Sequence, residues 1–426
     1  MAPNAIISNG FGRFSLRLAA AEAARRDALT AFITGAYPTP GLARALSALG
    51  LSRLKPVRRF LGREDSIPGT RVRAMWAGEP FSQVASRMRH LPAVGDLLAD
   101  RLHMFARVLY ARGASRVIRR EADPSGPGVY HYRAGFGGAS VALARERGWV
   151  CLCEYSIAHL SVLEHLVRNG GQMPAPGEAG PIDVNWRAIR DDLNRADQVL
   201  ANSDFVKETF VHQGWAPDRV NVIYRGIDDG FLSTLPDHAP ENLDVDAPDA
   251  GPLQLLFAGS VRRRKGTDDL ADAMAALEGV DLQLGVCGSV DREGGAAFEQ
   301  FRADPRVTYH GNLLPAELAA RMVAADVFVF PTLAEGSARV VFEAMAAGCY
   351  VVTTANAGSI VEDGVHGRLV APGNPDALAA ALREAAADRA RVAQVGRDNA
   401  ALIRRDHRQA EYGTRLFELY ERLSRR

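Results

Sequence analysis

The alternation of short apolar runs with helical segments in the second half of the chain most constrains how it can fold. Between residues 253 and 353, apolar runs of strand length are separated by segments with helical spacing. This alternation is typical of a parallel sheet with helices on both faces, which binds ligands in the loops at the carboxyl ends of its strands. The runs are LQLLFAGS, DLQLGVCGS, RVTYHG, DVFVFP and YVVTTA, and the helical segments are TDDLADAMAAL, AAFEQFRA, PAELAARMVAA and VVFEAMA.

The first half of the chain repeats this alternation less regularly. The segments NAIISNG, RFSLRLAAAEAARR and LTAFITG predict a strand, a helix and a strand, and a basic, poorly periodic stretch follows them. The alternation resumes in GVYHYRAG, GWVCLCEY, QVLANSD and RVNVIYRG. Between Leu232 and Pro252 the chain is acidic, rich in proline and without a period, which indicates a linker or surface loop.

These patterns predict an α/β fold with two Rossmann-like, doubly wound domains that face each other across a cleft. A chain of 426 residues is too long for one hydrophobic core. We expect one domain over residues 1–228 and the other over residues 229–404. The last segment, residues 405–426, predicts an amphipathic helix that packs back on the first domain. Two sheets with facing carboxyl ends suit an enzyme with two substrates.

Charge is distributed unevenly along the chain. Residues 1–120 contain 20 Lys and Arg against 7 Asp and Glu, whereas residues 121–426 contain 31 against 43. A basic part favours partners that carry phosphate, and because no nucleic-acid motif accompanies it, an anionic membrane surface is the better functional interpretation. The alternative is a solvated, Arg-rich face.

The N-terminal sequence, the hydropathy and the cysteines predict a cytoplasmic protein. The chain begins MAPNAIISNG, without the charged and apolar regions of a secretory signal, and no uncharged apolar window approaches 18 residues. Only four cysteines occur, which suits a reducing compartment. Peripheral attachment to the inner face of the membrane is compatible with these features.

Three strand ends in the second domain carry residues suited to a nucleotide. In GSVRRRKG a strand closes with glycine and four cations follow, and cations fixed there, above all Arg264 and Lys265, could clamp a diphosphate. VCGS and YHGN also close with glycine, which lets a ligand approach the backbone. The alternatives are a surface basic run and ordinary turns. The candidate ligand-binding positions at these strand ends are Gly259, Ser260, Gly288, Asn312 and Leu313.

The stretch PTLAEGSARVVFEAMAAG carries two acids, Glu335 and Glu343, in an otherwise apolar context. Gly336 predicts a tight turn into a helix, whose free N–H groups could bind phosphate. These N–H groups belong to Ser337, Ala338, Arg339 and Val340. Glu335 then lies at the ligand, and Glu343, a costly acid inside the helix, could grip a vicinal diol such as a ribose. The alternative is that Glu343 is a structural acid or pairs with Arg339.

FAGSVRRRKG, PTLAEGSARVVFEAMAAG and GVHGRLVAPGNPDALAAAL together resemble the C-terminal domain of family 4 retaining glycosyltransferases, which have the GT-B fold. The E-x₇-E pair that marks this family is matched at Glu335 and Glu343. The resemblance is strong between residues 220 and 382. It is thinner in the first domain, through HYRAGFGG and RADQVLANSDFVKETFVHQGWAPDRVNVIYRGID.

The resemblance implies that residues 1–228 form an acceptor-binding domain and residues 229–404 a donor-binding domain. It also implies roles for these residues and no metal or cofactor. Glu335 would contact hydroxyls of the donor sugar, Glu343 the ribose, and Arg264 and Lys265 the diphosphate. Two departures stand out. Ser260 replaces an arginine that many relatives carry after the strand glycine, a charge that Arg264 could supply. Ala338 and Arg339 replace a glycine and an apolar residue, so Arg339 could reshape the sugar pocket.

In the first domain, SNGFGRFS opens a helix after the first strand. It could be mistaken for an NAD fingerprint, but the second strand, TAFITGAYP, ends without the acid that such a site needs. The resemblance instead implies that Gly10 and Gly12 let the donor phosphates approach this loop.

The acceptor side is less specific. Many relatives carry a histidine at the end of a middle strand, and CLCEYSIAHL offers Glu154 and His159 there as candidates to orient the acceptor hydroxyl or take its proton. His159 could instead be a core histidine. His131 and Arg133, at another strand end, are candidate acceptor or phosphate ligands.

The expected function is therefore the retaining, metal-independent transfer of a hexose from a UDP- or GDP-sugar to a hydroxyl, in the synthesis of a glycan, polysaccharide or glycolipid. The acceptor could be lipid-linked. Two rival interpretations are a GT-B nucleotide-sugar epimerase and a nucleotide-sugar-binding partner without catalysis.

Overall fold

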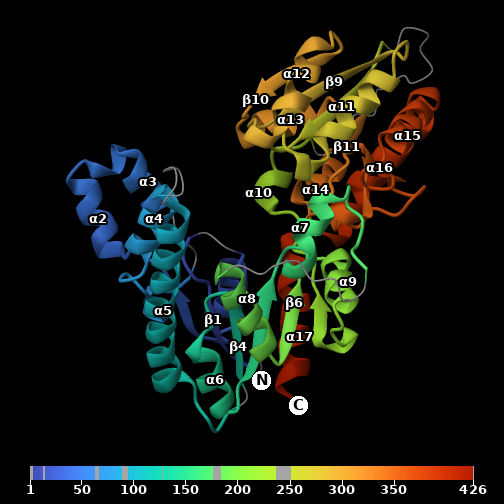
Figure 1. The fold of residues 1–426 in the computed structure, drawn as a ribbon. Coiled ribbons are helices and arrows are strands. Elements are labelled where there is room, and N and C mark those ends of the chain that lie inside the picture. Colours follow the sequence, from blue (N-terminus) through green and yellow to red (C-terminus); the bar gives the residue numbers. More distant parts are fainter. Residues whose placement is uncertain are drawn as a thin grey trace.

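A computed structural model describes residues 3–12, 15–62, 67–88, 95–126, 128–175, 184–236 and 251–425. The chain forms two α/β domains, one above the other in Figure 1. Most of the predicted linker, residues 237–250, lies outside the described residues.

The first domain is built on a seven-stranded sheet with the order β3-β2-β1-β4-β5-β6-β7. Every neighbouring pair is parallel. The strands are β1 (Asn4–Ser8), β2 (Leu29–Thr34), β3 (Val72–Ala74), β4 (Gly128–Arg133), β5 (Val150–Tyr155), β6 (Gln198–Ala201) and β7 (Val220–Val222). The helices are α1 (Leu16–Arg25), α2 (Pro40–Ala48), α3 (Lys55–Leu61), α4 (Glu79–Met88), α5 (Gly95–Glu121), α6 (Ala139–Glu146), α7 (Leu160–Arg168), α8 (Val184–Arg195) and α9 (Asp204–His212).

The second domain is built on a six-stranded parallel sheet with the order β10-β9-β8-β11-β12-β13. The strands are β8 (Leu253–Ala258), β9 (Leu282–Cys287), β10 (Val307–Gly311), β11 (Val327–Phe330), β12 (Tyr350–Thr353) and β13 (Gly367–Leu369). The helices are α10 (Asp229–Leu232), α11 (Thr267–Ala276), α12 (Gly295–Ala303), α13 (Pro315–Val323), α14 (Arg339–Ala346), α15 (Pro375–Ala387) and α16 (Arg389–Asp406).

The C-terminal helix α17 (Gln409–Ser424) returns to the first domain. Its apolar face, including Leu416, Phe417 and Tyr420, packs with residues of β1, β2 and α1 in one core cluster. The opposite face of the same sheet is covered by a second cluster to which α5 contributes Tyr110 and Ile118. The first sheet is therefore buried on both faces, as its near-continuous apolar strands require.

The basic stretch that lacks a clear period contains the longest helix, the 27-residue α5. Its buried face carries Ala106, Tyr110, Ala114 and Ile118, at helical spacing. Its exposed face also carries large apolar side chains, among them Phe105 and Val108. Since both faces are partly apolar, the amphipathic period that identifies a helix is blurred.

Candidate active site

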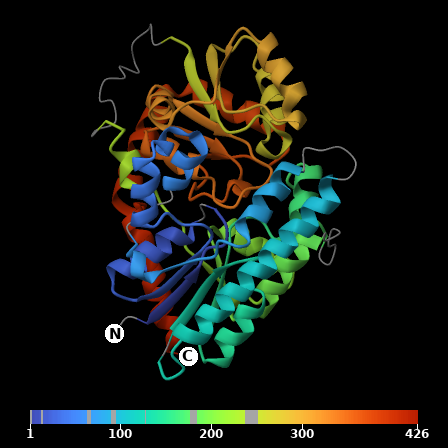
Figure 2. The ribbon, with the colours of Figure 1, turned by 90° about the vertical axis from the view of Figure 1, so that its left-hand side faces the viewer.

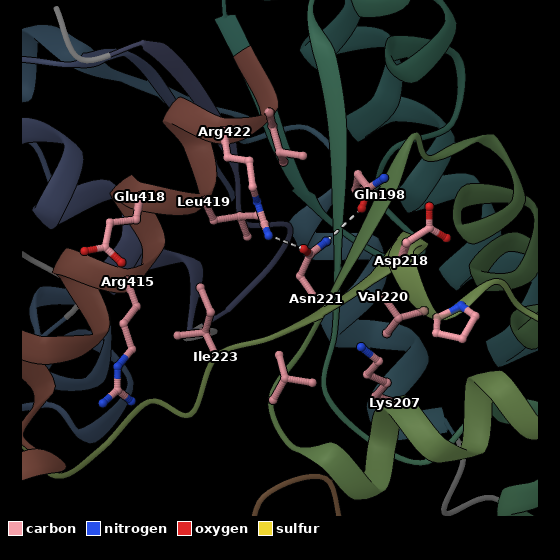
Figure 3. A pocket seen from close by; sticks show the side chains of 13 residues that line it. Gln198, Lys207, Asp218, Val220, Asn221, Ile223, Arg415, Glu418, Leu419 and Arg422 are labelled. Atoms are coloured by element: carbon pink, nitrogen blue, oxygen red, sulfur yellow. Dashed lines mark hydrogen bonds between the residues drawn. The ribbon is translucent and has the colours of Figure 1, made fainter. Parts of the chain in front are cut away.

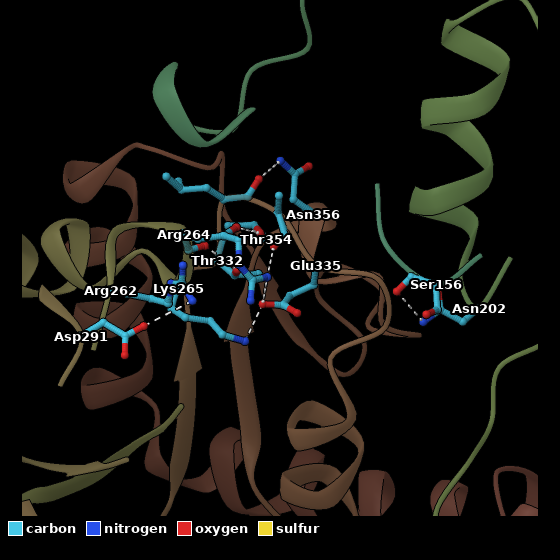
Figure 4. A network of polar contacts seen from close by, with 12 residues as sticks. Ser156, Asn202, Arg262, Arg264, Lys265, Asp291, Thr332, Glu335, Thr354 and Asn356 are labelled. Carbon is cyan, nitrogen blue, oxygen red and sulfur yellow. Dashed lines mark hydrogen bonds and ion pairs between the residues drawn. The ribbon is translucent and has the colours of Figure 1, made fainter. Parts of the chain in front are cut away.

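The best-defined polar cluster lies at the carboxyl end of the second sheet, between β8 and β11. The chain winds from β8 outward to β9 and β10, and from β11 outward to β12 and β13, so these neighbours form the topological switch point. Glu335 follows β11, and Arg264 and Lys265 lie in the turn after β8. Three residues predicted from two separate motifs thus meet at one place, which Figure 4 shows from close by.

One carboxylate oxygen of Glu335 accepts hydrogen bonds from both Arg264 and Lys265. The Oε1 atom is 2.6 Å from Nη1 of Arg264 and 2.5 Å from Nζ of Lys265. All three side chains are at most one-fifth exposed. Burial lowers the pKa of Lys265, although Glu335 opposes this shift. Two cations and one carboxylate leave positive charge at a partly buried place, where an anionic ligand is favoured.

The backbone ties the two loops of this cluster together. The carbonyl of Arg264 accepts from the Leu333 N–H and from the Thr332 hydroxyl, at 2.9 and 2.8 Å. Gly266 has φ of +69°, and a Cβ there would lie 1.9 Å from the carbonyl oxygen of Pro331. Only glycine allows this approach, so the glycine of the RKG sequence holds the two cations against the Glu335 loop.

The second acid of the E-x₇-E pair has a protein partner. Arg339 donates from Nε to Oε1 of Glu343 at 2.8 Å, and the same guanidinium pairs with Asp228. Burial raises the pKa of Glu343, and the charge of Arg339 opposes this shift. The salt-bridge alternative for Glu343 is therefore what the structure contains. Asp228, which precedes α10 in the chain segment between the sheets, was missed by sequence reasoning because its contact spans 111 residues.

The amino end of α14 is partly satisfied by the protein itself. The helix begins at Arg339, and the N–H of Ala338 donates to the carbonyl of Ala357 at 2.9 Å. Within the described part of the chain, the N–H groups of Ser337, Arg339 and Val340 have no such backbone partner. The expectation of free N–H groups is thus correct for these three positions and wrong for Ala338, which is used to fix the loop.

The glycine that closes β9 has a packing reason, whereas a Cβ on Gly259, which closes β8, would make only ordinary contacts. A Cβ on Gly288 would lie 2.0 Å from the carbonyl oxygen of Gly259, and the N–H of Gly288 donates to the carbonyl of Gly311 at 2.7 Å. Gly259 and Ser260 follow β8, and Asn312 and Leu313 follow β10 on the other side of β9, so all four lie at the carboxyl edge of the sheet, as predicted from their positions after apolar runs. Close strand packing therefore explains Gly288 without a ligand.

Gly336 joins the two domains. A Cβ there would lie 1.9 Å from the carbonyl oxygen of Ser156 and 2.9 Å from Nδ2 of Asn202, both in the first domain. Ser203 also donates from its hydroxyl to the carbonyl of Gly336. The turn that carries Glu335 is thus pressed against the first domain.

We predict that Gly336→Ala lowers the free energy of unfolding by about 1–3 kcal/mol, because the added methyl group cannot fit beside the Ser156 carbonyl. Urea unfolding measures this change. Gly295→Ala is the matched control, since Gly295 has helical angles and no heavy atom within 4 Å of a built Cβ. That control should be neutral or slightly stabilising. Equal stability of Gly336→Ala and the wild type would contradict the prediction.

In the first domain the two predicted glycines differ. Gly10 has φ of +78° and is packed against the ring of Phe136, which a Cβ would approach to 2.7 Å. Its N–H donates to the hydroxyl of Tyr110 at 2.9 Å. Gly12 has φ of +85° and open space around it. Close approach of a ligand is therefore available at Gly12, whereas Gly10 shapes the loop.

Glu154 is the centre of a buried polar network at the end of β5. Its Oε1 accepts from the hydroxyl of Ser15 and from Nη2 of Arg225, the latter at 2.9 Å. Its Oε2 is 3.6 Å from Nε2 of His131. Burial raises the pKa of Glu154, but the charge of Arg225 and the other polar contacts outweigh it, so the pKa lies below its ordinary value. Ser15 and Arg225 were not singled out from the sequence, because neither lies in a recognisable motif.

His131 does not face the cleft. It is fully buried, and its Nδ1 is 2.6 Å from the hydroxyl of Tyr420 on α17. Burial lowers its pKa to about 4, so the ring is neutral near pH 7. An acceptor cannot reach this ring in the conformation described, and its role as an acceptor ligand has no support. Arg133, two residues further, is partly exposed at the end of β4.

His159 is a capping and core residue. Its Nδ1 accepts from the N–H of Ser161 at the start of α7, and its ring packs edge-to-face on Phe210 with centroids 4.8 Å apart. Only 7% of it is exposed. The alternative of a core histidine therefore matches the structure, and nothing places His159 toward an acceptor.

We predict that His159 makes the protein less stable as the pH falls from about 6.5 to 4. Burial lowers its pKa to about 4 in the folded protein, against about 6.5 when unfolded, so the unfolded state binds more protons in this window. The stabilisation is complete above pH 6.5, and about 2 kcal/mol of it is lost at pH 5. His159→Asn keeps a capping side chain without the titration. Urea unfolding at pH 7 and 5 should show a smaller loss for this variant, and an equal loss would contradict the assignment.

A pocket between the domains adjoins the polar contacts of Glu154 and those of Glu343. It has a volume of about 400 Å³ and is lined from the first domain by Ser15, Arg17, Leu18 and Asn202, from the segment between the sheets by Arg225, Gly226 and Asp228, and from the remainder of the chain by Ser337, Arg339, Phe342 and Gln409. The Oδ1 atom of Asn202 is buried without a hydrogen-bond partner among the described residues. Another cavity, of about 540 Å³, lies between β7 and α17, and none of the predicted site residues lines it (Figure 3).

Comparison with known proteins identifies the family. A model described as "Glycosyltransferase Family 4" matches residues 75–231, and one described as "Glycosyl transferases group 1" matches residues 252–388. The chain is 32% identical to D-inositol 3-phosphate glycosyltransferase 1 of Catenulispora acidiphila over 72% of its own length and 73% of that protein. It is 30% identical to a D-inositol 3-phosphate glycosyltransferase of Pseudarthrobacter chlorophenolicus, covering 52% of each chain.

Solved structures share the fold over the whole length. A sucrose-phosphate synthase from Thermosynechococcus elongatus has 19% identity and a TM-score of 0.63, with 99% of each chain covered. Anabaena Alr3699/HepE in complex with UDP has 17% identity and a TM-score of 0.60, with 98% of this chain and 100% of that chain covered. The two doubly wound sheets are thus those of the GT-B fold, and the chain belongs to glycosyltransferase family 4.

Proposed function

We propose that this glycosyltransferase moves a hexose from a UDP- or GDP-sugar to an acceptor hydroxyl with retention at the anomeric carbon and without a metal ion. The observation that carries the proposal is the position of Glu335 between Arg264 and Lys265 at the switch point of the second sheet. The family membership and the E-x₇-E pair at Glu335 and Glu343 support it. Such a reaction would serve the synthesis of a glycan, a polysaccharide or a glycolipid.

The two cations suit the departing group of this reaction. When the bond between the anomeric carbon and the diphosphate oxygen breaks, negative charge grows on the diphosphate. Arg264 and Lys265 are fixed by Glu335 and by the backbone bonds of the Arg264 carbonyl, so they need little reorganisation to stabilise that charge. An arriving diphosphate would also favour the charged form of Lys265, whose pKa burial lowers. In this proposal fixed cations provide the charge that a metal ion provides in other enzymes.

Other residues around these strand ends are proposed to contact the rest of the donor. The hydroxyls of the sugar would meet Glu335, and the ribose would meet Glu343, for which Arg339 already competes. The open positive-φ loop at Gly12 and the N–H groups at the start of α14 would meet the phosphates. On the acceptor side Arg133 and Glu154 stay as proposed residues, with Glu154 held by Ser15 and Arg225.

The names of the relatives indicate which acceptor to test first. Since they are described as D-inositol 3-phosphate glycosyltransferases, we propose a phosphorylated cyclic polyol as the first acceptor class.

Thermal stabilisation by a panel of UDP- and GDP-sugars should identify the donor, since a ligand at 100 times its Kd stabilises by about 2.7 kcal/mol. Mass spectrometry with the best donor and inositol phosphates then detects transfer, with and without EDTA, and NMR assigns the anomer of the product. Transfer that survives EDTA with retained configuration supports the proposal. Isomerisation of the sugar without acceptor would identify an epimerase, and binding without turnover a non-catalytic partner.

A further inference from the structure

The outward face of α5 is an unbroken stripe of apolar and cationic side chains. Residues three or four apart lie on one face of a helix, and the exposed positions of α5 follow this spacing. They are Leu97, Leu98, Arg101, Phe105, Val108, Arg112, Arg116, Arg119 and Arg120. Figure 2 turns the side of the molecule along which α5 runs toward the reader.

The chemical character of the exposed side chains changes along the length of the stripe. Its first half exposes Leu97, Leu98, Phe105 and Val108, which are 63%, 41%, 47% and 43% exposed. Its second half exposes arginines only. Single exposed apolar side chains are normal on a protein surface, but a contiguous row of them on a helix marks an interaction site.

Helix α4 extends the apolar half. Its Phe81 and Val84 are 39% and 46% exposed, and the Phe81 ring packs edge-to-face on Phe105 with centroids 5.1 Å apart. The exposed faces of the two helices are therefore continuous, and we call them together the α4–α5 ridge. Nine of the 13 large apolar side chains found exposed in the described parts of the chain lie between Leu49 and Val108.

Glu79 and Glu121 are paired within the protein, and Asp100 on α5 is half-buried. Glu79 is buried and accepts from the N–H of Ala36 at 2.5 Å. Glu121 accepts from Arg73 at 2.6 and 2.9 Å. No Asp or Glu is exposed among the side chains of α4 and α5 that the structure describes. The described side chains of the ridge thus present cations and apolar groups together, with no exposed Asp or Glu among them.

We propose that the α4–α5 ridge docks on a membrane surface that contains anionic lipids. The apolar half would enter the boundary between head groups and acyl chains, and the arginines would contact lipid phosphates. A second copy docking through the same ridge would bring its arginines near those of its partner, and the described side chains of the ridge offer no exposed acid to pair them. This inference goes beyond glycosyl transfer and does not depend on the donor or the acceptor.

The ridge is connected to the cleft through one helix. Tyr110, on the inner face of α5, bonds to Ser8 and to the N–H of Gly10, in the loop proposed to meet the donor phosphates. A helix with its side chains is roughly 10 Å across, so docking through the ridge holds this loop close to the membrane. A lipid-linked acceptor would then lie near the cleft.

Co-sedimentation of the full chain with vesicles tests the ridge. We expect tight binding to vesicles of equal parts phosphatidylglycerol and phosphatidylcholine at low salt, and at least tenfold weaker binding to phosphatidylcholine alone or at high salt. Replacing Arg112, Arg116 and Arg119 with Gln should weaken binding to the anionic vesicles at least tenfold. The matched control replaces Arg292, Arg302 and Arg383, exposed cations of the second domain, and should leave binding unchanged.

Two further measurements distinguish insertion of the ridge into a membrane from self-association of the chain. Phe105→Trp should show a blue-shifted emission that brominated lipids quench, and an unquenched signal would overturn insertion. Dimers by light scattering that the double variant Phe105→Ser, Val108→Ser dissociates, with no vesicle binding, would assign the ridge to self-association and overturn the proposal. Unchanged thermal stabilisation by the donor in all ridge variants is expected, so failure here is distinguishable from failure of the proposed function.

Discussion

Lys265→Met is expected to lower kcat by about 100- to 1,000-fold while leaving the fold intact. Its ammonium group lies 2.5 Å from Glu335 and is mostly buried, at the place where charge develops on the departing diphosphate. Removing one fixed donor that stabilises such charge typically costs this much in other enzymes. Affinity for the free nucleotide should fall less than turnover, because the developing charge is greatest in the transition state. Steady-state kinetics with the donor found by thermal stabilisation measures both.

Arg262→Met is the matched control for this prediction. Arg262 belongs to the same cationic run but pairs with Asp291 and Glu293, away from Glu335. Its replacement removes the same charge and should change kcat less than about threefold. Near-normal turnover of Lys265→Met would show that the cation run is only a surface feature. An equal loss in both variants would show that the net charge of the loop matters, and not the position of Lys265.

Glu343→Ala is expected to weaken nucleotide binding by about 10- to 100-fold, since a hydrogen bond to a charged group contributes about 1.5–3 kcal/mol. Glu343 is only 15% exposed, and burial raises its pKa, so its retention in an apolar helix indicates a ligand or a permanent partner. Calorimetry with the free nucleoside diphosphate measures the loss.

The pair with Arg339 makes this prediction sharper. If Arg339 competes with the ribose for Glu343, Arg339→Ala should bind the nucleotide at least as tightly as the wild type does. If Arg339 instead holds Glu343 as a structural acid, Glu343→Ala will keep normal affinity and will lose thermal stability. The double variant should bind like Glu343→Ala alone, because the two side chains act through one contact.

Much of the fold followed from local patterns. The strands that begin at Asn4, Leu29 and Leu253 were found because fully buried strands of a parallel sheet read as apolar runs. Helix α5 escaped, because Phe105 and Val108 on its outer face hide the contrast on which a helical period depends. The exposed apolar side chains that hide the helical period are the same side chains that form part of the α4–α5 ridge.

The candidate site divides in the same way. Glu335, Arg264 and Lys265 were found because each follows an apolar run, and the carboxyl ends of parallel strands meet at one edge of a sheet. His131 lies within β4, two residues before its end, and His159 caps α7, but the two rings are buried against Tyr420 and Phe210. Position in a motif places a backbone, whereas the packing of a distant element decides whether the side chain is accessible.

The sequence alone determined the two-domain α/β architecture, the family through the E-x₇-E pair, and the loop that carries Glu335. These follow from periods of two and 3.6 residues and from short spacings, which are properties of neighbouring residues. Only the tertiary structure decided that Arg339 joins Glu343 to Asp228, that Ser15 and Arg225 hold Glu154, and that Gly336 touches Ser156. Arg339 and Glu343 lie one helical turn apart, but the other contacts join residues separated by 71 to 180 positions in the sequence. They depend on how two sheets and two domains pack, which no local pattern encodes.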